Sequence, residues 1–273
     1  MTVHFIGAGP GAADLLTLRA ARLLAETPVC LYAGTYLDAE VLGHCASGTE
    51  LVDTQNLDLD QIIGHLVEAH RRGLDAVRLC SGDPSIYSAL TEQTRRLDAA
   101  GVPWDVTPGV PAYAAAAAIL GKELTVPGEV QTVVLTRTQA QSTAMPASES
   151  LARVAGIKAS MVLHLAIRRV PALVADLLPE YGADCPVVVV AHASRPNQLV
   201  LRGTLSDIST QVEASGLRQA ALIFVGSAMG QASPCGIDSH LYDPARTRQD
   251  GAVEEPVSGP RSFAVSTSRK LCS

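Results

Sequence analysis

Two glycine-rich turns contain the residue types that most clearly indicate a ligand-binding site. The first is GAGPG at residues 7–11, and the second is SGDP at residues 81–84. Each turn follows a short apolar run, at residues 3–6 and 76–80, and precedes a stretch with helical spacing of apolar residues. In an open α/β sheet, strand-to-helix turns lie at the carboxyl ends of the strands, where ligands bind. The spacing therefore predicts two loops on one rim of a cleft.

The first turn also fits the dinucleotide-binding pattern G-x-G-x-x-G/A, with Gly7, Gly9 and Ala12. A nicotinamide-binding unit needs, in addition, a carboxylate at the end of the second strand to hold the ribose hydroxyls. The second apolar run, at residues 29–32, is followed by Ala-Gly and not by an acidic residue. Pro10 also removes an N–H group from the loop that would hold a phosphate. A nicotinamide-dependent reductase is therefore the weaker alternative.

Three motifs taken together resemble those of the tetrapyrrole methylases, which are S-adenosylmethionine-dependent enzymes of corrin and sirohaem synthesis. They are GAGPG followed by DLLT, VRLCSGDP, and PGV, and they lie at residues 7–17, 77–84 and 108–110. Within that family, LYAG at residues 31–34 and LTVP at residues 124–127 resemble the precorrin-4 C(11)-methyltransferases. The resemblance covers most of the chain.

The resemblance implies an α/β fold, with two αβα domains of the tetrapyrrole methylase type and a cleft between them. It also implies transfer of a methyl group from S-adenosyl-L-methionine to carbon 11 of precorrin-4, a step of cobalamin biosynthesis. Ala33 stands where uroporphyrinogen methylases usually carry an aspartate, which argues against uroporphyrinogen as the acceptor. A precorrin methylase acting at carbon 20 or 17, and a non-enzymatic corrin-binding carrier, remain alternatives from the sequence.

The resemblance also assigns donor contacts, residue by residue, where the motifs match. The expected donor-binding residues are Pro10, Ser81, Gly82, Asp83, Ile86, Pro111, Ala112, Leu165 and Ala193. Ala193 replaces a glycine of the family, so only its backbone groups could serve there. Main-chain groups in apolar pockets suit a donor whose adenosine carries no phosphate. For Asp83, capping of the following helix is a structural alternative.

In the implied reaction, the protein takes little part in covalent chemistry. A methyl group on a sulfonium is already electrophilic, so its displacement by an electron-rich ring carbon depends mainly on positioning. The sequence shows no Ser-His-Asp or Cys-His pattern. It does not identify a catalytic residue for the proton loss that follows.

A polycarboxylate precorrin would have to bind to a chain whose net charge is -6. We therefore expect positive charge at the cleft, with Arg137 and Lys122 as first candidates and Tyr87 as a further substrate contact. Arginine is favoured because its planar fork matches a carboxylate bidentately. For the neighbouring pair Arg168 and Arg169, a solvated helix face is an equal alternative. Tyr87 could equally be a core residue.

The composition limits the class of protein. A chain of 273 residues is long enough for two domains, and no apolar run reaches the roughly 18 residues of a membrane span. No basic and apolar leader precedes the first strand, which predicts a cytoplasmic protein without a membrane partner. The acidic balance disfavours nucleic acid as a partner, and the six cysteines and the histidines show no metal-ligand spacing. The family resemblance implies a homodimer.

Strand-length apolar runs alternate with longer helical stretches, which is typical of a parallel sheet with covering helices. In the first half, strands are expected at residues 3–6, 29–32, 51–52, 76–80 and 104–107, and helices at 12–24, 59–70, 86–97 and 112–118. In the second half, strands are expected at 131–136, 161–165, 186–191, 199–201 and 221–225, and helices at 168–178 and 205–215. The expected domains are residues 1–120 and 121–231, followed by a disordered tail at 232–273.

Overall fold

The first half of the chain forms a parallel sheet. The computed structural model describes residues 1–34, 37–138, 144–230 and 238–239. Its first sheet has the strand order β3-β2-β4-β1-β5, and all its pairings are parallel. The strands are β1 (Val3–Gly7), β2 (Val29–Tyr32), β3 (Glu50–Asp53), β4 (Ala76–Cys80) and β5 (Trp104–Thr107). Because β1 and β4 are neighbours, the two glycine-rich turns that follow them lie side by side.

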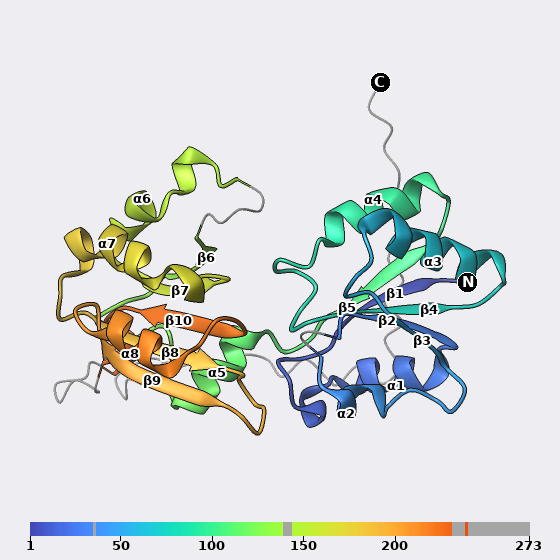
Figure 1. Cartoon of the computed structure of the whole chain (residues 1–273), viewed down its shortest axis with the longest axis horizontal. Helices are drawn as coiled ribbons and strands as arrows, with labels where there is room; N and C mark the ends of the chain where they lie inside the picture. The colour runs from blue at the N-terminus through green and yellow to red at the C-terminus, as the bar shows by residue number, and fades with distance from the viewer. Residues whose placement is uncertain (35–36, 139–143, 231–237, 240–273) are drawn as a thin grey trace, which may run out of the picture. The chain divides into compact units, whose positions relative to one another are not determined.

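Helices cover both faces of this sheet. They are α1 (Leu18–Glu26), α2 (Ala39–Leu42), α3 (Leu59–Arg71) and α4 (Leu90–Ala99), with α3 and α4 on one face and α1 and α2 on the other (Figure 1). Successive strand residues point to opposite faces, so Phe5 packs in the α3–α4 core while Ile6 packs in the α1–α2 core. The alternation seen in the sequence is therefore an αβα arrangement.

Two helices begin later than their apolar spacing predicts. The helix expected from residue 12 begins at Leu18, because the Thr17 hydroxyl accepts a hydrogen bond from the Ala20 N–H at 3.1 Å and caps the helix there. The short 3₁₀ helix η1 (Ala13–Leu15) precedes it. The helix expected from residue 86 begins at Leu90, because Tyr87 and Ala89 take left-handed backbone conformations that end regular helix.

The second half forms a mixed sheet with the strand order β6-β7-β10-β8-β9. Its strands are β6 (Val133–Arg137), β7 (Ser160–His164), β8 (Pro186–Ala191), β9 (Leu199–Thr204) and β10 (Ala221–Val225). Strands β6 and β7 pair in parallel, whereas β7–β10, β10–β8 and β8–β9 are antiparallel. The second sheet is therefore not a repeat of the first, and both belong to the predicted α/β class.

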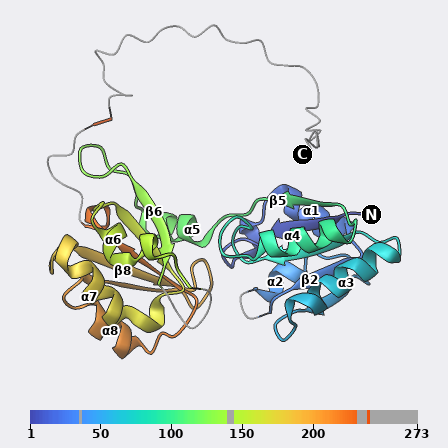
Figure 2. The same cartoon turned by 90° about the horizontal axis from the view of Figure 1, so that it is seen from above.

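The second sheet is also covered on both faces. Helices α6 (Leu151–Ala155), α7 (Val170–Tyr181) and α8 (Ile208–Ser215) share one core, and Figure 2 shows α7 and α8 next to each other. The opposite face packs against α5 (Ala112–Leu120), through Ala116 and Leu120. Short 3₁₀ helices are η2 (Ala147–Glu149), η3 (Ile167–Arg169) and η4 (Ser227–Met229). Thus α5 follows the first sheet in sequence but packs with the second.

The division into domains 1–120 and 121–231 stays a prediction. Both sheets lie in one compact unit of the chain. The tail expected to be disordered, residues 232–273, lies outside the described residues except for 238 and 239. Within the described ranges, no helix is both long and apolar enough to cross a membrane.

Candidate functional site

Three loops meet at the carboxyl edge of the first sheet, and glycines allow them to touch. The Ala8 N–H donates to the Cys80 carbonyl at 2.8 Å, and Gly9 and Gly82 exchange backbone hydrogen bonds at 2.8 and 3.2 Å. A side-chain carbon on Gly7 would lie 2.7 Å from the Gly82 carbonyl oxygen and closer still to Gly109. The first two motifs and the PGV motif therefore form one joined structure, and no larger residue fits at its centre.

Asp83 fastens this structure through its carboxylate. One oxygen accepts the Ser85 N–H and the other accepts the Gly109 N–H, each at 2.8 Å, and the Ser85 hydroxyl donates to the carboxylate as well. Partial burial would raise the pKa of Asp83, but these hydrogen bonds hold it below its ordinary value. Residue Ala89, and not Asp83, occupies the N-cap position of α4. Asp83 therefore joins the second and third loops and does not cap the helix.

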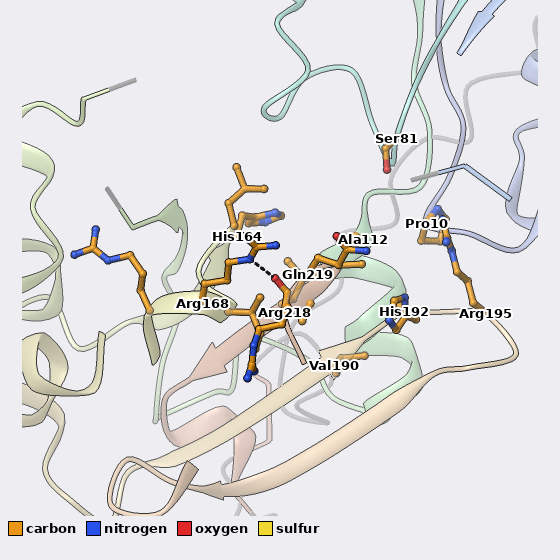
Figure 3. A pocket seen from close by; sticks show the side chains of 17 residues that line it. Pro10, Ser81, Ala112, His164, Arg168, Val190, His192, Arg195, Arg218 and Gln219 are labelled. Carbon is orange, nitrogen blue, oxygen red and sulfur yellow. Dashed lines mark hydrogen bonds between the residues drawn. The ribbon is translucent and has the colours of Figure 1, made fainter. Parts of the chain in front are cut away.

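A cavity of about 480 Å³ opens beside these loops, a size suited to a small organic ligand (Figure 3). It is lined from the first half by Pro10, Ser81 and Ala112, and from the second half by Leu165 and Ala193, among others. These five residues are expected donor contacts. The other four, Gly82, Asp83, Ile86 and Pro111, lie in the same loops but not among the described lining residues. The structure thus brings both halves of the predicted donor site to one cavity.

The glycine-rich loop also touches the loop between β8 and β9. The Ala12 N–H donates to the Ser194 hydroxyl at 3.0 Å. A side-chain carbon on Gly11 would lie 2.6 Å from Cγ of Arg195, so the glycine leaves room for the arginine stem. These contacts close one side of the cavity.

Left-handed backbone conformations concentrate around the cavity. Leu165, His192 and Ala220 line it with φ angles of 54°, 50° and 52°, and Ser194 beside it has a φ of 66°. A non-glycine residue in this region costs free energy and is held there by its surroundings. The strain lies at the same loops as the predicted donor contacts, which supports a functional role for them.

Positive side chains from the second half surround the cavity. Arg168, Arg169, Arg195 and Arg218 line it, and no acidic residue does so within the described chain. Nε of Arg168 donates to the Arg218 carbonyl at 2.8 Å, as the dashed line in Figure 3 marks. This contact ties the start of α7 to the segment before β10. The net negative chain therefore presents a locally positive cavity.

The expected acceptor contacts are placed differently. Arg137 lines a second cavity of about 200 Å³, which Arg169 also lines. The Lys122 ammonium donates to the Gly230 carbonyl, and Lys122 borders a shallow hollow beside α5. Tyr87 is about half exposed, at 49%. The roles of Arg137, Lys122 and Tyr87 in acceptor binding stay predictions.

Two histidines of the cavity wall have buried ring nitrogens without a hydrogen-bond partner in the described part of the protein. They are Nε2 of His164 and Nδ1 of His192. Burial lowers the pKa of His164 to about 4, so its ring is neutral at pH 7. The Tyr87 ring lies 5.3 Å from the His164 ring, between centroids, at an angle of 56°. Unsatisfied polar atoms on a cavity wall indicate contacts that a ligand completes.

These histidines, and Arg195 and Arg218, were not among the site residues expected from the sequence. The histidines follow or end apolar strands, at the end of β7 and just after β8, and this position was the available signal. Arg195 lies in the connection between β8 and β9, and Arg218 in the connection between α8 and β10, and no motif marks either.

The chain is similar to known proteins of one family. The family model described as Tetrapyrrole (Corrin/Porphyrin) Methylases matches residues 2–209. A precorrin-4 C(11)-methyltransferase of Rhodococcus erythropolis is 52% identical over 248 residues, which cover 91% of this chain and 99% of the relative.

Solved structures show the same likeness. The crystal structure of the cobalt precorrin-4 methyltransferase CbiF aligns with a TM-score of 0.81 and 33% identity, over 84% of this chain and 96% of that one. A uroporphyrin-III C-methyltransferase of Thermus thermophilus, complexed with S-adenosylhomocysteine, has a TM-score of 0.70 and 27% identity, over 84% and 93%. On the joined loops, the two-sheet fold and these matches, the chain belongs to the tetrapyrrole methylases.

Proposed function

We propose that the protein transfers a methyl group from S-adenosyl-L-methionine to carbon 11 of precorrin-4, in corrin synthesis. The observation that carries this proposal is the cavity that both halves of the predicted donor site line together. Its support from relatives is the 52% identity to a precorrin-4 C(11)-methyltransferase over nearly its whole length.

The cavity fits the donor in size and polarity. A volume of about 480 Å³ is within the usual range for small-molecule sites. Pro10, Ser81, Ala112, Leu165 and Ala193 supply backbone and small side chains at its wall, which suits an uncharged nucleoside. The buried nitrogens of His164 and His192 offer hydrogen bonds that the bound donor can complete. The loops that hold the donor are shaped by the other four expected contacts, Gly82, Asp83, Ile86 and Pro111.

The chain contributes to the reaction by positioning the donor and the acceptor more than by supplying reactive groups. When bound, S-adenosylmethionine supplies its methyl group as an electrophile and keeps the electron pair of the broken bond on sulfur. The joined loops and the Ser194 contact fix one wall of the cavity, and a donor held against this wall would present its methyl group to an acceptor in a fixed position. The neutral His164 does not add to the positive charge that the arginines place at the cavity wall.

The positive cavity wall explains how an acidic protein binds a polycarboxylate acceptor. Arg168 and Arg218 use their described hydrogen bonds on backbone carbonyls, so further guanidinium N–H groups remain for acceptor carboxylates. Arg137 and Tyr87 extend this surface in the proposal, since the charge of Arg137 acts on the Tyr87 hydroxyl and partly opposes the rise that burial causes in the pKa of Tyr87. Lys122, which borders the hollow beside α5, remains a proposed acceptor contact.

The comparisons favour an acceptor without cobalt. The relative named for precorrin-4 is 52% identical, whereas the structure named for cobalt precorrin-4 is 33% identical. We propose the cobalt-free ring as the preferred acceptor. A homodimeric assembly and a cytoplasmic location stay predictions.

Methyl transfer into purified precorrin-4 tests the function. With S-adenosylmethionine labelled with ¹³C in its methyl group, we expect a product heavier by one labelled methyl, with the label placed at carbon 11 by NMR. The same assay with cobalt precorrin-4 should run more slowly. A label at carbon 17 or 20 would indicate another precorrin methylase. Tight binding of precorrin-4 without transfer would indicate a carrier.

A further inference from the structure

The loop at residues 84–89, between the SGDP turn and α4, is held in an unusual conformation. Tyr87 and Ala89 have φ angles of 54° and 55°, and neither is a glycine. Such residues cost free energy and persist only where their surroundings hold them. The loop matters for the site because it sets the Tyr87 ring against His164, whose ring lines the cavity.

Gln93, in the first turns of α4, holds the end of this loop. It is only 2% exposed. Its side-chain Nε2 donates to the carbonyls of Ser88 at 3.2 Å and Ala89 at 3.1 Å. Its Oε1 accepts from Nε of Arg78 at 3.2 Å. Both ends of the buried amide are therefore satisfied. The Ser88 carbonyl accepts from this side-chain donor, and the Ala89 carbonyl accepts from it and also from the Gln93 backbone N–H at 3.2 Å.

Arg78 determines which way this amide faces. It lies in β4, and its Nη1 donates to the Thr54 hydroxyl at 3.1 Å, while that hydroxyl donates to the Tyr32 carbonyl at 2.9 Å. A guanidinium has donors only, so it must face the amide oxygen. The amide nitrogen is then directed at the loop, and the flipped amide would place two donors together. Burial lowers the pKa of Arg78 below its ordinary value, but arginine stays charged in proteins.

We propose that Gln93 is a positioning residue for methyl transfer: oriented by Arg78, its amide holds loop 84–89 in the left-handed conformation that sets Tyr87 against His164 at the cavity. Thr54, which follows β3, anchors Arg78 and completes a chain of hydrogen bonds from the Tyr32 carbonyl of β2 to the loop. This assignment rests on the proposed function for its consequence in catalysis, but the loop conformation can be measured without catalysis.

The variant Gln93→Glu separates the two ends of the amide. The carboxylate keeps the contact with Arg78, as an ion pair, but it places an acceptor against the Ser88 and Ala89 carbonyls. We expect hydrogen exchange of the backbone amides of residues 85–89 to accelerate at least about tenfold, while exchange in the strands of both sheets is unchanged. We also expect kcat/KM for precorrin-4 to fall by about tenfold to 100-fold, with the affinity for S-adenosylhomocysteine within about twofold.

Thr94 provides the matched control. It is the next residue of α4, is 8% exposed, and donates its hydroxyl to the Thr91 carbonyl at 3.3 Å, within its own helix. Thr94→Val should leave loop exchange and kcat/KM near those of the wild type. Arg78→Lys is the second variant, because lysine still donates to the amide but lacks the fork that also reaches Thr54. It should show a smaller acceleration in the same loop.

The outcomes separate this proposal from the proposed function. Unchanged loop exchange in folded Gln93→Glu, or equal acceleration in Thr94→Val, overturns the positioning role. If Gln93→Glu does not fold, Arg78→Lys decides by the same measurement. If the wild type does not methylate precorrin-4, the proposed function fails, whereas loop exchange still tests whether Gln93 holds the loop.

Discussion

The two sheets contribute to the site in different ways. The first sheet supplies loops whose glycines let backbones touch, with Gly7, Gly82 and Gly109 at the point of contact. The second sheet supplies side chains, among them Arg168, Arg218 and the neutral His164. The first half therefore depends on the absence of side chains at the point of contact. The second half depends on the charge of its arginines and on the uncharged state of His164. Substitutions in the two halves should accordingly impair stability and ligand binding in different ways.

The largest effect should come from Gly109→Ala. The added carbon would lie 2.8 Å from Cα of Gly7 and closer still to the Gly82 carbonyl oxygen, so three backbones would have to move. We expect a loss of about 3 kcal/mol in the free energy of unfolding, measured with urea, and loss of S-adenosylhomocysteine binding. Gly64→Ala in α3 is the control, since nothing lies within 4 Å of its added carbon. It should stabilise the protein by about 0.5–1 kcal/mol.

Equal effects of the two glycine substitutions would contradict the close contact of the loops.

The next effect depends on pH and concerns His164. Burial holds its pKa at about 4, below the ordinary 6.5, so the unfolded chain binds the proton first as the pH falls. The stabilisation is complete above pH 6.5 and is lost progressively towards pH 4, by up to about 3 kcal/mol. His164→Gln should lose this part of the pH dependence in urea unfolding. His65→Gln, at an exposed site in α3, should keep it.

An unchanged slope in His164→Gln would assign the pH dependence to another group.

A smaller effect is expected for the charge of the second half. Arg168→Gln should raise KM for precorrin-4 about tenfold, because a charge-assisted hydrogen bond to a carboxylate is lost. Its affinity for S-adenosylhomocysteine should not change. Arg153→Gln removes an exposed arginine that lines neither cavity, and it should leave both quantities unchanged. If the two variants behaved alike, net charge and not the cavity wall would attract the acceptor.

The smallest effect concerns the contact between the two regions. Ser194→Ala removes the acceptor of the Ala12 N–H. We expect about 1 kcal/mol lower stability and a severalfold weaker affinity for S-adenosylhomocysteine by calorimetry. Ser206→Ala, which removes an exposed hydroxyl of the same half, is the control. A loss of stability without a loss of affinity would show that the contact supports the fold and not the donor site.

The same comparison explains what sequence reasoning could find. The parallel sheet was predictable, because strand-length apolar runs alternate with helical spacing and the glycine motifs mark the turns. The glycine motifs also marked two of the loops beside the cavity. The donor contacts were expected from the family resemblance, and of these Pro10, Ser81 and Ala112 line the cavity, while their role in donor binding stays a prediction. The antiparallel pairing of β8, β9 and β10 left no comparable signal, since strand direction is set by tertiary contacts.

The positive wall was the least predictable part of the site. Arg137 and Lys122 stood out in sequence beside motifs, whereas Arg218 comes to the cavity only because the segment before β10 passes the start of α7. The left-handed conformations of Leu165 and Ala220 have no signature in residue type, because neither is glycine or asparagine.

The packing of α5 has a consequence for how the chain can be divided and for the order in which it folds. The helix is synthesised directly after β5, yet its inner face, with Ala116 and Leu120, is covered by β8 and β10. A fragment ending at residue 121 would carry this face uncovered, whereas a cut before Ala112 would leave each core with its own helices. During synthesis on the ribosome, α5 cannot pack fully until β10, the last strand of the second sheet, has been made. A face made largely of alanine exposes little apolar surface during that delay, which limits the opportunity for aggregation.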